Sequence, residues 1–367
     1  MRVLYFTEKD SPHDRRFLRA LAETPHQVFA LRQTPCLPET PRGITEVHWP
    51  EGVPDWSHWL GWEAGQGQLS ELLAGIEPDL IHAGPVQGPA LLTALIGFHP
   101  LITMSWGSDL LLRAKRSPWM RLATGYTLKR TDVLLADCQT VADEAVCLGF
   151  PKDRIVQFPW GVDLEHFTPE KAVQAGQPMR DDLGWESHFV ILCNRTWAPV
   201  YGVDVLAAAF VKAADENPTL RLILGGSGLQ GDVIRGILSP VEEKVWFPGR
   251  VDREKLPGLY GAADLFVSPS HSDGSSVSLM EALASGLPVL VSDIPSNREW
   301  VTPGHVGGLF KDGEVSSLKA QLLRMVGDPS LLNYGKKARA LAERRADWRT
   351  NFKILINAYE KGVSVNP

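Results

Sequence analysis

The sequence is poor in cysteine and lacks a long apolar run, and each shortage excludes a class of protein. Four of the 367 residues are cysteines, Cys36, Cys138, Cys147 and Cys193, and no two form a C-x-x-C pair. This spacing predicts neither a disulfide framework nor a zinc site, so we expect four reduced and buried thiols. The longest apolar runs, such as 90–98, fall well short of the roughly 20 residues that a membrane-spanning helix needs.

Positive charge is also scarce. Lys and Arg number 37 against 43 Asp and Glu, which gives a formal net charge of −6 and argues against a protein that coats nucleic acid. Residues 1–7 run directly into charged residues without the longer apolar core of a signal peptide, so we expect a cytoplasmic protein. Hydrophobic residues make up 44% of the chain, which is typical of a folded globular protein and excludes disorder.

The sequence does contain an alternation of strand-like and helical segments, which predicts parallel sheets. The strand-like runs form two series, 2–7, 27–31, 79–82, 101–105 and 133–137, then 189–193, 220–225, 245–247, 265–268 and 288–292. Between the series, 158–163 and 168–178 carry proline, glycine and polar residues, as linkers do. We therefore predict an α/β protein with one domain over 1–165 and a second over 166–345.

The remaining segment, 346–367, contains a predicted amphipathic helix. Its apolar residues recur at three- and four-residue spacing: Trp348, Phe352, Leu355, Ile356 and Tyr359. An apolar face of this kind must pack on another part of the chain.

The stretch 263–289 is the most informative candidate site, because it reads as strand, polar loop, helix, glycine stop and strand. A helix starting near Ser275 would direct its free N–H groups toward the carboxyl end of the strand, where open α/β sheets bind anions. Gly274 would let the backbone approach a phosphate, and Glu281 would lie about two turns further on, within reach of hydroxyl groups. The alternative is a capping box formed by Ser278 and Glu281, with Gly274 in a plain turn.

The same stretch resembles the signature of the retaining GT-B glycosyltransferases of family four, the glycosyl transferases group 1. In that signature two acidic residues eight positions apart flank a glycine and a small-residue loop before a helix, and Asp273 and Glu281 have this spacing. Other segments follow the family's order along almost the whole chain: 155–167 (IVQFPWGVDLEHF), 222–228 (LILGGSG), 245–249 (VWFPG) and 256–269 (LPGLYGAADLFVSP).

This resemblance implies a GT-B fold, in which two Rossmann-like domains face a cleft and a C-terminal helix crosses back to the first domain. It implies transfer of a sugar from a nucleotide-diphosphate sugar, such as a UDP- or GDP-sugar, with retention of anomeric configuration. The donor would bind the C-terminal domain, and a sugar, a lipid-linked molecule or another small acceptor would bind the N-terminal domain. The alternatives are a nucleotide-sugar-binding protein with attenuated catalysis and another sugar-nucleotide enzyme on the same fold.

Carried over by position, the resemblance also implies roles in donor binding. Glu281 would bind the ribose hydroxyls, and the amides of Gly274, Ser275 and Ser276 would meet the diphosphate. Asp273 stands where the family usually has glutamate, near the hydroxyls of the donor sugar, and we expect it to act in catalysis.

Three further residues of the second domain would contact the donor. Arg195 matches the family's phosphate-binding arginine and is expected to act in catalysis, since a guanidinium suits paired phosphate oxygens; the alternative is a surface arginine. Tyr201 stands where the family usually supplies a lysine, and it can donate only a neutral and weaker hydrogen bond. Arg250 lies in the loop that the family places near the nucleobase.

In the first domain, 105–109 (SWGSD) resembles the family's H-G-[ST]-D turn. Trp106 replaces a histidine that often contacts the donor sugar, so it would either stack on a sugar face or pack in the protein. Asp109 is the nearest acidic candidate for catalysis, and its alternative role is to cap the following helix.

Two histidines are candidates for the acceptor side. His13 follows the first strand, where the alternative is a surface helix cap with Asp14 starting the helix. His82 ends another predicted strand and is the second candidate.

No D-x-D pair and no His/Asp cluster has the spacing of a metal site. We therefore expect a metal-independent reaction without a cofactor, in which the protein stabilises the departing diphosphate.

A basic segment is the last feature that the sequence distinguishes. Residues 110–131 contain six cations and no acidic residue: Arg113, Lys115, Arg116, Arg121, Lys129 and Arg130. The interleaved Trp119 favours peripheral contact with an anionic membrane, at the cytoplasmic face. The alternative is a solvated basic face.

Overall fold

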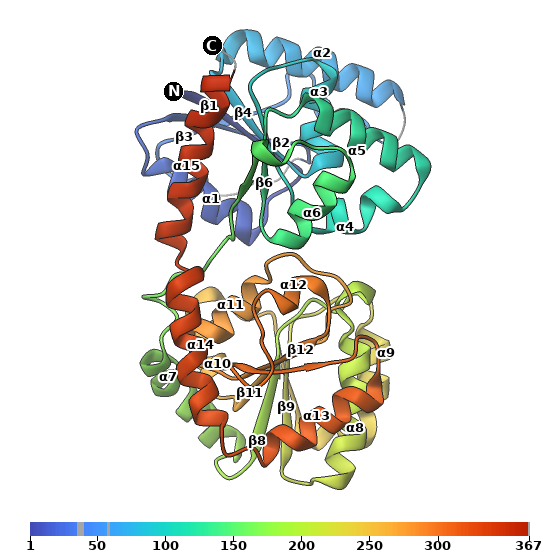
Figure 1. Ribbon diagram of the computed structural model, residues 1–367, viewed down its shortest axis with the longest axis vertical. Helices are drawn as coiled ribbons and strands as arrows, with labels where there is room; N and C mark the ends of the chain where they lie inside the picture. The colour runs from blue at the N-terminus through green and yellow to red at the C-terminus, as the bar shows by residue number, and fades with distance from the viewer. Residues whose placement is uncertain (35–39, 57–58, 366–367) are drawn as a thin grey trace. The chain divides into compact units, whose positions relative to one another are not determined.

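The computed structural model describes residues 1–34, 40–56 and 59–365, and the chain folds into two compact units (Figure 1). One unit comprises Met1–Phe158 with Phe352–Pro367, and the other Pro159–Asn351. Segment 159–165 therefore lies in the second unit and not in the first domain, where we predicted it. The reason is backbone pairing, because the Val162 amide donates to the Ala346 carbonyl at 2.7 Å.

The first unit is built on a parallel sheet of seven strands. The strands are β1 (Arg2–Thr7), β2 (Gln27–Arg32), β3 (Ile44–Val47), β4 (Leu80–Gly84), β5 (Leu101–Met104), β6 (Val133–Ala136) and β7 (Ile155–Gln157). Their order is β3-β2-β1-β4-β5-β6-β7, so the direction of winding reverses between β1 and β4. This is the doubly wound arrangement of a Rossmann-like domain.

Helices cover this first sheet. They are α1 (Pro12–Ala22), α2 (Trp59–Ile76), α3 (Leu91–Leu95), α4 (Ser108–Leu111), α5 (Pro118–Arg130) and α6 (Gln139–Cys147), with short turns η1 (Val86–Ala90), η2 (Arg113–Lys115) and η3 (Lys152–Arg154). The helix α15 (Trp348–Val365) spans both units, and its residues from Phe352 onward belong to the first.

The second unit repeats the plan with six parallel strands. They are β8 (Phe189–Cys193), β9 (Leu220–Gly225), β10 (Val245–Gly249), β11 (Leu265–Ser268), β12 (Val289–Ser292) and β13 (Gly307–Phe310). Their order, β10-β9-β8-β11-β12-β13, places the reversal between β8 and β11.

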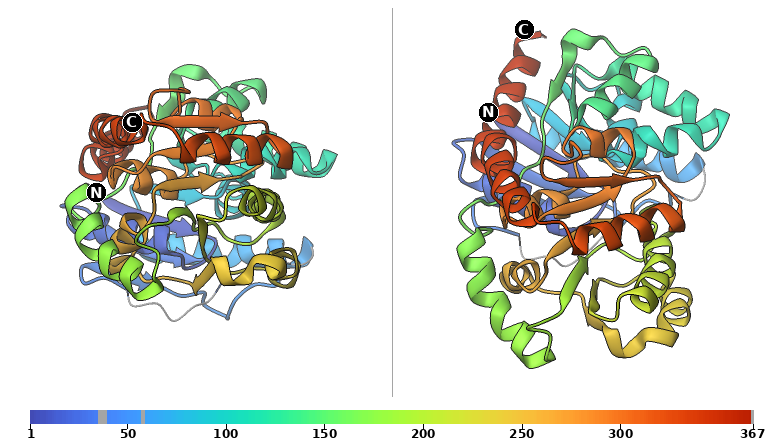
Figure 2. Two further views of the ribbon diagram at one scale, coloured as in Figure 1. Left: turned by 90° about the horizontal axis from the view of Figure 1, so that it is seen from below. Right: turned by 60° about the horizontal axis from the view of Figure 1, so that its bottom comes forward.

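Helices of the second unit lie on both faces of its sheet (Figure 2). They are α7 (Pro169–Leu183), α8 (Val203–Glu216), α9 (Gly231–Leu238), α10 (Leu256–Gly261), α11 (Val277–Ala284), α12 (Pro295–Arg298), α13 (Val315–Val326) and α14 (Leu331–Arg345), with turns η4 (Pro199–Tyr201), η5 (Ser239–Lys244) and η6 (Arg253–Lys255). Strand β8 serves both faces, because Val190 and Leu192 enter one apolar core and Ile191 and Cys193 enter the other.

The prediction that 168–178 is a linker is wrong, because these residues form most of α7. The Thr168 hydroxyl accepts from the Lys171 amide at 3.2 Å and caps the helix, and Pro169 occupies its first turn. Gly184 ends it in the left-handed conformation at φ 65°. Pro169 and Gly184 therefore mark the two ends of the helix, whereas Gly176 and Pro178 lie inside it.

The cysteine prediction is correct only in part. Cys138 and Cys193 are buried free thiols, whereas Cys147 is exposed at the end of α6. Cys36 lies outside the described residues. Among the described helices, none combines the length and the apolar character that crossing a bilayer requires.

The C-terminal helix packs on the first sheet, as predicted. The Tyr359 hydroxyl on α15 shares a hydrogen bond of 2.6 Å with Nδ1 of His82 on β4. Further along, Gly362 lies against the side chains of Ile102 and Val133, so closely that a Cβ there would approach Ile102 to 2.3 Å.

The same contact corrects the acceptor-side role predicted for His82. Its side chain is fully buried between Tyr5 and Tyr359, and burial lowers its pKa to about 3. His82 is therefore a neutral packing residue that anchors the C-terminal helix.

Stability should accordingly fall in acid through His82. Because its pKa is lowered from 6.5 to about 3, the unfolded chain binds a proton in that interval that the folded chain rejects. The stabilisation is complete above pH 6.5 and is lost toward pH 3, at up to about 1.4 kcal/mol per pH unit. Urea unfolding of the wild type and His82→Asn should show the free-energy difference shrinking over this range; a difference independent of pH contradicts the assignment.

Candidate active site

The candidate site lies at the carboxyl ends of β8 and β11, which are neighbours in the second sheet. This pair is the point at which the direction of winding reverses, and ligands of open α/β sheets bind in the crevice that forms there. Arg195 follows β8 by two residues, and the loop after β11 carries Asp273 and leads into α11. The sheet therefore brings together residues that are far apart in the sequence.

Arg195 links the two loops. Its Nη1 donates to the hydroxyls of Ser276 at 2.8 Å and Ser278 at 3.0 Å, and its Nη2 donates to Asp273 at 2.5 Å. Its side chain is 10% exposed, so the alternative of a surface arginine is wrong. The buried Nε has no hydrogen-bond partner among the described residues, so this donor of the guanidinium is unused.

Asp273 is held from two directions in this structure. One oxygen accepts from Arg195, and the other accepts from the amide of Gly274 at 3.1 Å. Burial raises the pKa of this carboxyl, and the neighbouring guanidinium opposes the rise. The Gly274 amide, which the resemblance assigned to a diphosphate, is thus engaged by the carboxylate that precedes it.

Helix α11 begins at Val277, two residues later than predicted. The hydroxyl of Ser276 accepts from the Leu279 amide at 3.4 Å and caps the helix. Ser278 therefore lies inside the first turn, and the capping box proposed for Ser278 and Glu281 does not form. Ser275 and Ser276 are buried beside Asp273 in the connecting loop.

Glu281 lies one turn into α11, and its carboxylate accepts from the Tyr260 hydroxyl at 2.7 Å. Tyr260 also accepts from the side-chain amide of Asn194 at 2.9 Å, next to Arg195. Neither partner was predicted from the sequence, although Tyr260 lies within the 256–269 segment and Asn194 precedes Arg195 directly.

The two other residues predicted to contact the sugar-nucleotide donor, Tyr201 and Arg250, lie in different places from each other. Tyr201 ends η4, and its ring centroid lies 4.3 Å from Cζ of Arg195. Arg250 is exposed after β10, which is separated from β8 by β9. Tyr201 thus belongs with Arg195, Asp273, Ser276 and Ser278 to one group of contacting side chains, the Arg195 cluster. Arg250 lies outside this cluster, beyond an intervening strand of the sheet.

In the first unit, Asp109 is buried, and its carboxylate accepts hydrogen bonds from several surrounding groups. It accepts from the Ser105 hydroxyl at 2.6 Å and from the amides of Val86, Trp106 and Leu110. Burial raises its pKa, and these donors oppose the rise. Both expectations for Asp109 are corrected, because the carboxylate organises the loop after β5 and Gly107 takes the N-cap position of α4.

The other first-unit candidates lie at the carboxyl ends of strands. Trp106 is half-buried with its indole nitrogen against Gly84 at the end of β4, where a Cβ would approach it to 3.0 Å. His13 is half-buried in the first turn of α1. The N-cap of that helix is Ser11, which accepts from the amide of Asp14, so the predicted cap at Asp14 is wrong.

Within 1–34, 40–56 and 59–365, no group of three or more His, Cys, Asp or Glu residues is arranged to hold a metal ion. A guanidinium such as that of Arg195 is a group that can bind an anion, and a carboxylate such as that of Glu281 is a group that can accept from hydroxyls.

Two family models match most of the chain between them. Residues 187–328 match the model described as "Glycosyl transferases group 1", and residues 2–138 match "Glycosyl transferase 4-like".

Curated relatives match over part of their length. The chain is 28% identical over 208 residues to a GDP-mannose-dependent monoacylated alpha-(1-6)-phosphatidylinositol monomannoside mannosyltransferase of Corynebacterium glutamicum, covering 54% of each chain. It is 29% identical over 209 residues to the phosphatidyl-myo-inositol mannosyltransferase of Mycolicibacterium smegmatis, covering 56% of this chain and 51% of that one. The chain thus spans about half the length of the curated relatives that it matches.

Solved structures of other proteins superpose on nearly the whole of this chain. HepE from Anabaena in complex with UDP superposes with a TM-score of 0.81 at 20% identity, over 98% of this chain and 100% of that one. Sucrose-phosphate synthase from Thermosynechococcus elongatus gives a TM-score of 0.79 at 20% identity over the full length of both chains. The family models and these neighbours agree, and the chain belongs to the group 1 glycosyltransferases, with the GT-B fold.

Proposed function

We propose that this protein transfers a sugar from a nucleotide-diphosphate sugar to an acceptor hydroxyl. The observation that carries the proposal is the position of Arg195, which is buried at the reversal of the second sheet and bonded to the start of α11. Membership of the glycosyltransferase family supports the same reading.

Arg195 would neutralise the diphosphate as it leaves. A guanidinium forms strong charge-assisted bonds to phosphate oxygens, and such bonds stabilise most where charge develops. Its unpaired Nε offers a donor already present in the folded protein. Asp273 is the group that a diphosphate would compete with for Nη2, and the released carboxylate could then accept from hydroxyls of the donor sugar.

Glu281 would bind the ribose. A carboxylate can accept from two neighbouring hydroxyls, and the bond from Tyr260 orients it. Ser275 and Ser276, buried before α11, would present their amides to the diphosphate at the positive end of the helix dipole.

We further propose that the reaction is metal-independent and uses no cofactor besides the donor. Arg195 and the amides at the start of α11 can supply the charge stabilisation that a divalent ion gives in other transferases. Retention of configuration rests on the resemblance to family four.

The names of the relatives guide the choice of substrates. The names of both relatives described above contain phosphatidylinositol, one of these names also contains GDP-mannose, and a structural neighbour holds UDP. We therefore propose a UDP- or GDP-sugar donor and a sugar or lipid-linked acceptor. An attenuated nucleotide-sugar-binding protein remains the second candidate, because Tyr201 and Trp106 replace a lysine and a histidine of the family pattern.

An assay of nucleotide release separates these two candidates. Incubation with UDP-, GDP- and ADP-sugars should release one nucleoside diphosphate, faster when a suitable acceptor is present. Tight donor binding without release would favour the attenuated protein.

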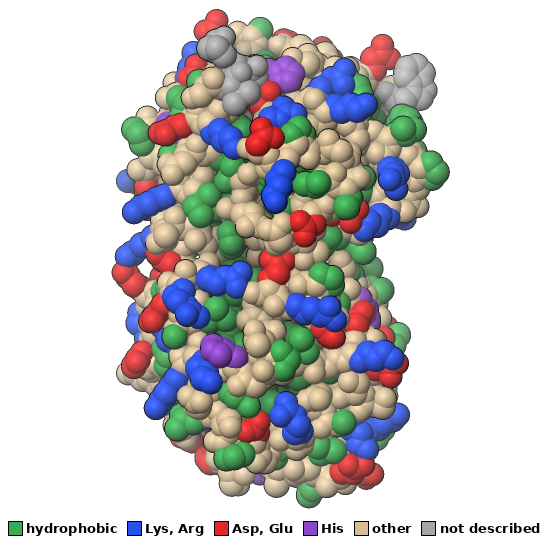
Figure 3. All heavy atoms as spheres, viewed as in Figure 1, with side chains coloured by type: hydrophobic (Ala, Val, Ile, Leu, Met, Phe, Trp, Pro, Cys, Tyr) green, Lys and Arg blue, Asp and Glu red, His purple; other side chains and the backbone are tan. Residues whose placement is uncertain are grey.

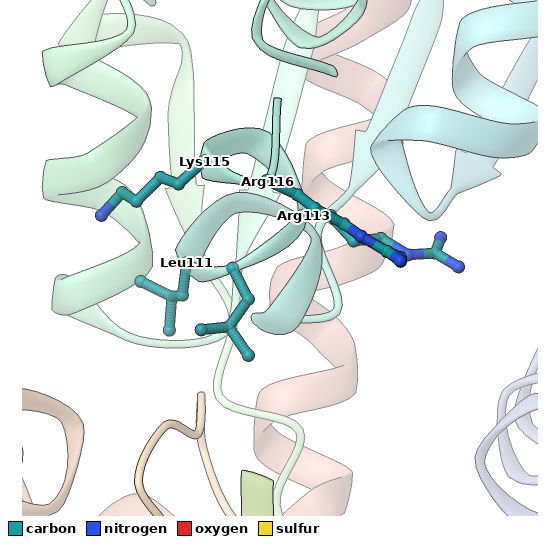
Figure 4. Close-up of a pocket in the computed structure, with 5 residues that line it drawn as sticks. Leu111, Arg113, Lys115 and Arg116 are labelled. Carbon is teal, nitrogen blue, oxygen red and sulfur yellow. The ribbon is translucent and has the colours of Figure 1, made fainter. Parts of the chain in front are cut away.

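The basic segment 110–131 supports a membrane contact, with a correction to its charge. Lys115 pairs with Glu144 at 2.7 Å and Arg113 lies 3.7 Å from Glu8, so two of the six cations have counter-charges. Lys115 points away from Arg113 and Arg116 around a shallow surface hollow (Figure 4).

Exposed apolar side chains accompany these cations on α5. Trp119 is 71% and Leu122 68% exposed, next to the exposed Arg116 and Arg121. Hydrophobic and basic side chains lie next to one another on the side of the first unit where α5 lies (Figure 3). We propose that this patch docks on an anionic membrane at the cytoplasmic face.

Replacement of Glu281 tests the ribose role. Glu281→Ala should weaken binding of UDP or GDP by about 1 to 3 kcal/mol, because the ribose hydroxyls lose their acceptor. Glu281→Gln, which can still accept from Tyr260, should lose less. Calorimetric titration measures the affinity and thermal unfolding the stability. A loss of stability with unchanged nucleotide affinity would assign Glu281 a structural role only.

Vesicle sedimentation tests the membrane contact. Wild-type protein should bind anionic vesicles at low salt, release them toward physiological salt, where the Debye length is about 8 Å, and bind neutral vesicles poorly. Arg116→Gln, Arg121→Gln and Trp119→Ala together should abolish binding. The matched control, Lys255→Gln with Lys336→Gln, removes two exposed cations of the second unit and should bind as wild type does. Wild-type protein that stays in the supernatant at low salt contradicts the proposal.

A further inference from the structure

The position at which the family usually has a lysine is occupied by Tyr201, whose ring lies against Arg195. Cζ of Arg195 is 4.3 Å from the ring centroid, well within the range of a cation–π contact. We propose that Tyr201 is a positioning residue that seats the Arg195 guanidinium for the diphosphate. This inference rests on the proposed function, and it assigns the aromatic ring a role that the hydroxyl does not share.

The ring completes the set of contacts that fixes the guanidinium. The two Nη groups bond to Ser276, Ser278 and Asp273, and Cζ of the same guanidinium lies over the Tyr201 ring. The Arg195 side chain is 10% exposed, and desolvation strengthens the attraction between a cation and a ring. An arginine held in this way loses little further freedom when it binds a phosphate, so the affinity of the site benefits from the order already present.

The loop that carries Tyr201 is itself tied to the loop that carries Asp273. The His271 amide donates to the Val200 carbonyl at 2.9 Å. A Cβ at Gly202 would lie 2.2 Å from a carbonyl oxygen of the second loop, and its φ of 58° is in the left-handed region. The ring and the carboxylate therefore approach the guanidinium from two loops whose separation the backbone fixes.

A tyrosine at position 201 would act on the diphosphate in a different way from a lysine. A lysine at 201 would bring a second positive charge to the diphosphate, whereas a neutral ring orients the cation that it supports. The competing interpretation is that the Tyr201 hydroxyl donates to a phosphate oxygen directly. The two interpretations differ in what happens when only the hydroxyl is removed.

Four variants of the full-length protein distinguish them: Tyr201→Phe, Tyr201→Leu, Arg195→Ala and the double variant with Tyr201→Leu and Arg195→Ala. Calorimetric titration with UDP and GDP gives their affinities. We expect Tyr201→Phe to bind within about two-fold of wild type and Tyr201→Leu about ten-fold more weakly, since only the latter loses the ring. Arg195→Ala should bind more weakly still, and the double variant should match it.

Two outcomes overturn the proposal. If Tyr201→Phe binds as poorly as Tyr201→Leu, the hydroxyl contacts the ligand. If Tyr201→Leu weakens binding equally with and without Arg195, the ring acts independently of the guanidinium.

A measurement without nucleotide keeps this proposal separate from the proposed function. The Nε–H signal of Arg195 in a nitrogen-15 NMR spectrum reports the order of its side chain. Tyr201→Leu should lower that order and Tyr201→Phe should preserve it, whether or not the protein binds a nucleotide. Unchanged order in Tyr201→Leu contradicts the positioning role, whereas failure of wild type to bind UDP or GDP contradicts only the proposed function.

Discussion

The second unit depends on one buried guanidinium. The Arg195 side chain lies where the direction of winding of the second sheet reverses. Asp273 balances its charge, and two serine hydroxyls accept hydrogen bonds from its Nη1. A buried charge is costly unless it is paired and hydrogen-bonded, so the loops after β8 and β11 must keep a fixed separation. That constraint explains why the cap of α11, the ring of Tyr201 and the short carboxylate of Asp273 all meet at one side chain.

Most strands could be predicted from the sequence because strands buried in a parallel sheet consist of short runs of β-branched and apolar residues. The strands missed are those whose residues do not carry that signal. β3 and β7 are half-exposed edge strands, and β13 starts with two glycines and is specified by pairing with β12. α7 was missed because Pro169, Gly176 and Pro178 also suit a linker, although the last two lie inside the helix. The hydrogen bond from the Lys171 amide to the Thr168 hydroxyl marks the start of a helix instead.

The candidate site was predictable in its residues and less so in its contacts. The eight-residue spacing of the family signature singled out Asp273 and Glu281. It did not indicate that Arg195 bonds to Asp273, nor that Tyr260 supports Glu281, because those pairs join segments 78 and 21 residues apart. His82, within β4, and Asp109, in the helix after β5, show the opposite limit, since the sequence around such a polar residue is the same whether it faces a ligand or the interior.

We have proposed that the Arg195 cluster holds the diphosphate of a sugar-nucleotide donor. A crystal structure of the full-length protein with UDP or GDP would locate that diphosphate. We expect phosphate oxygens against the Arg195 guanidinium and the amides before α11, with the ribose hydroxyls at Glu281. A nucleotide bound elsewhere, with Arg195 still paired only to Asp273, Ser276 and Ser278, would contradict it.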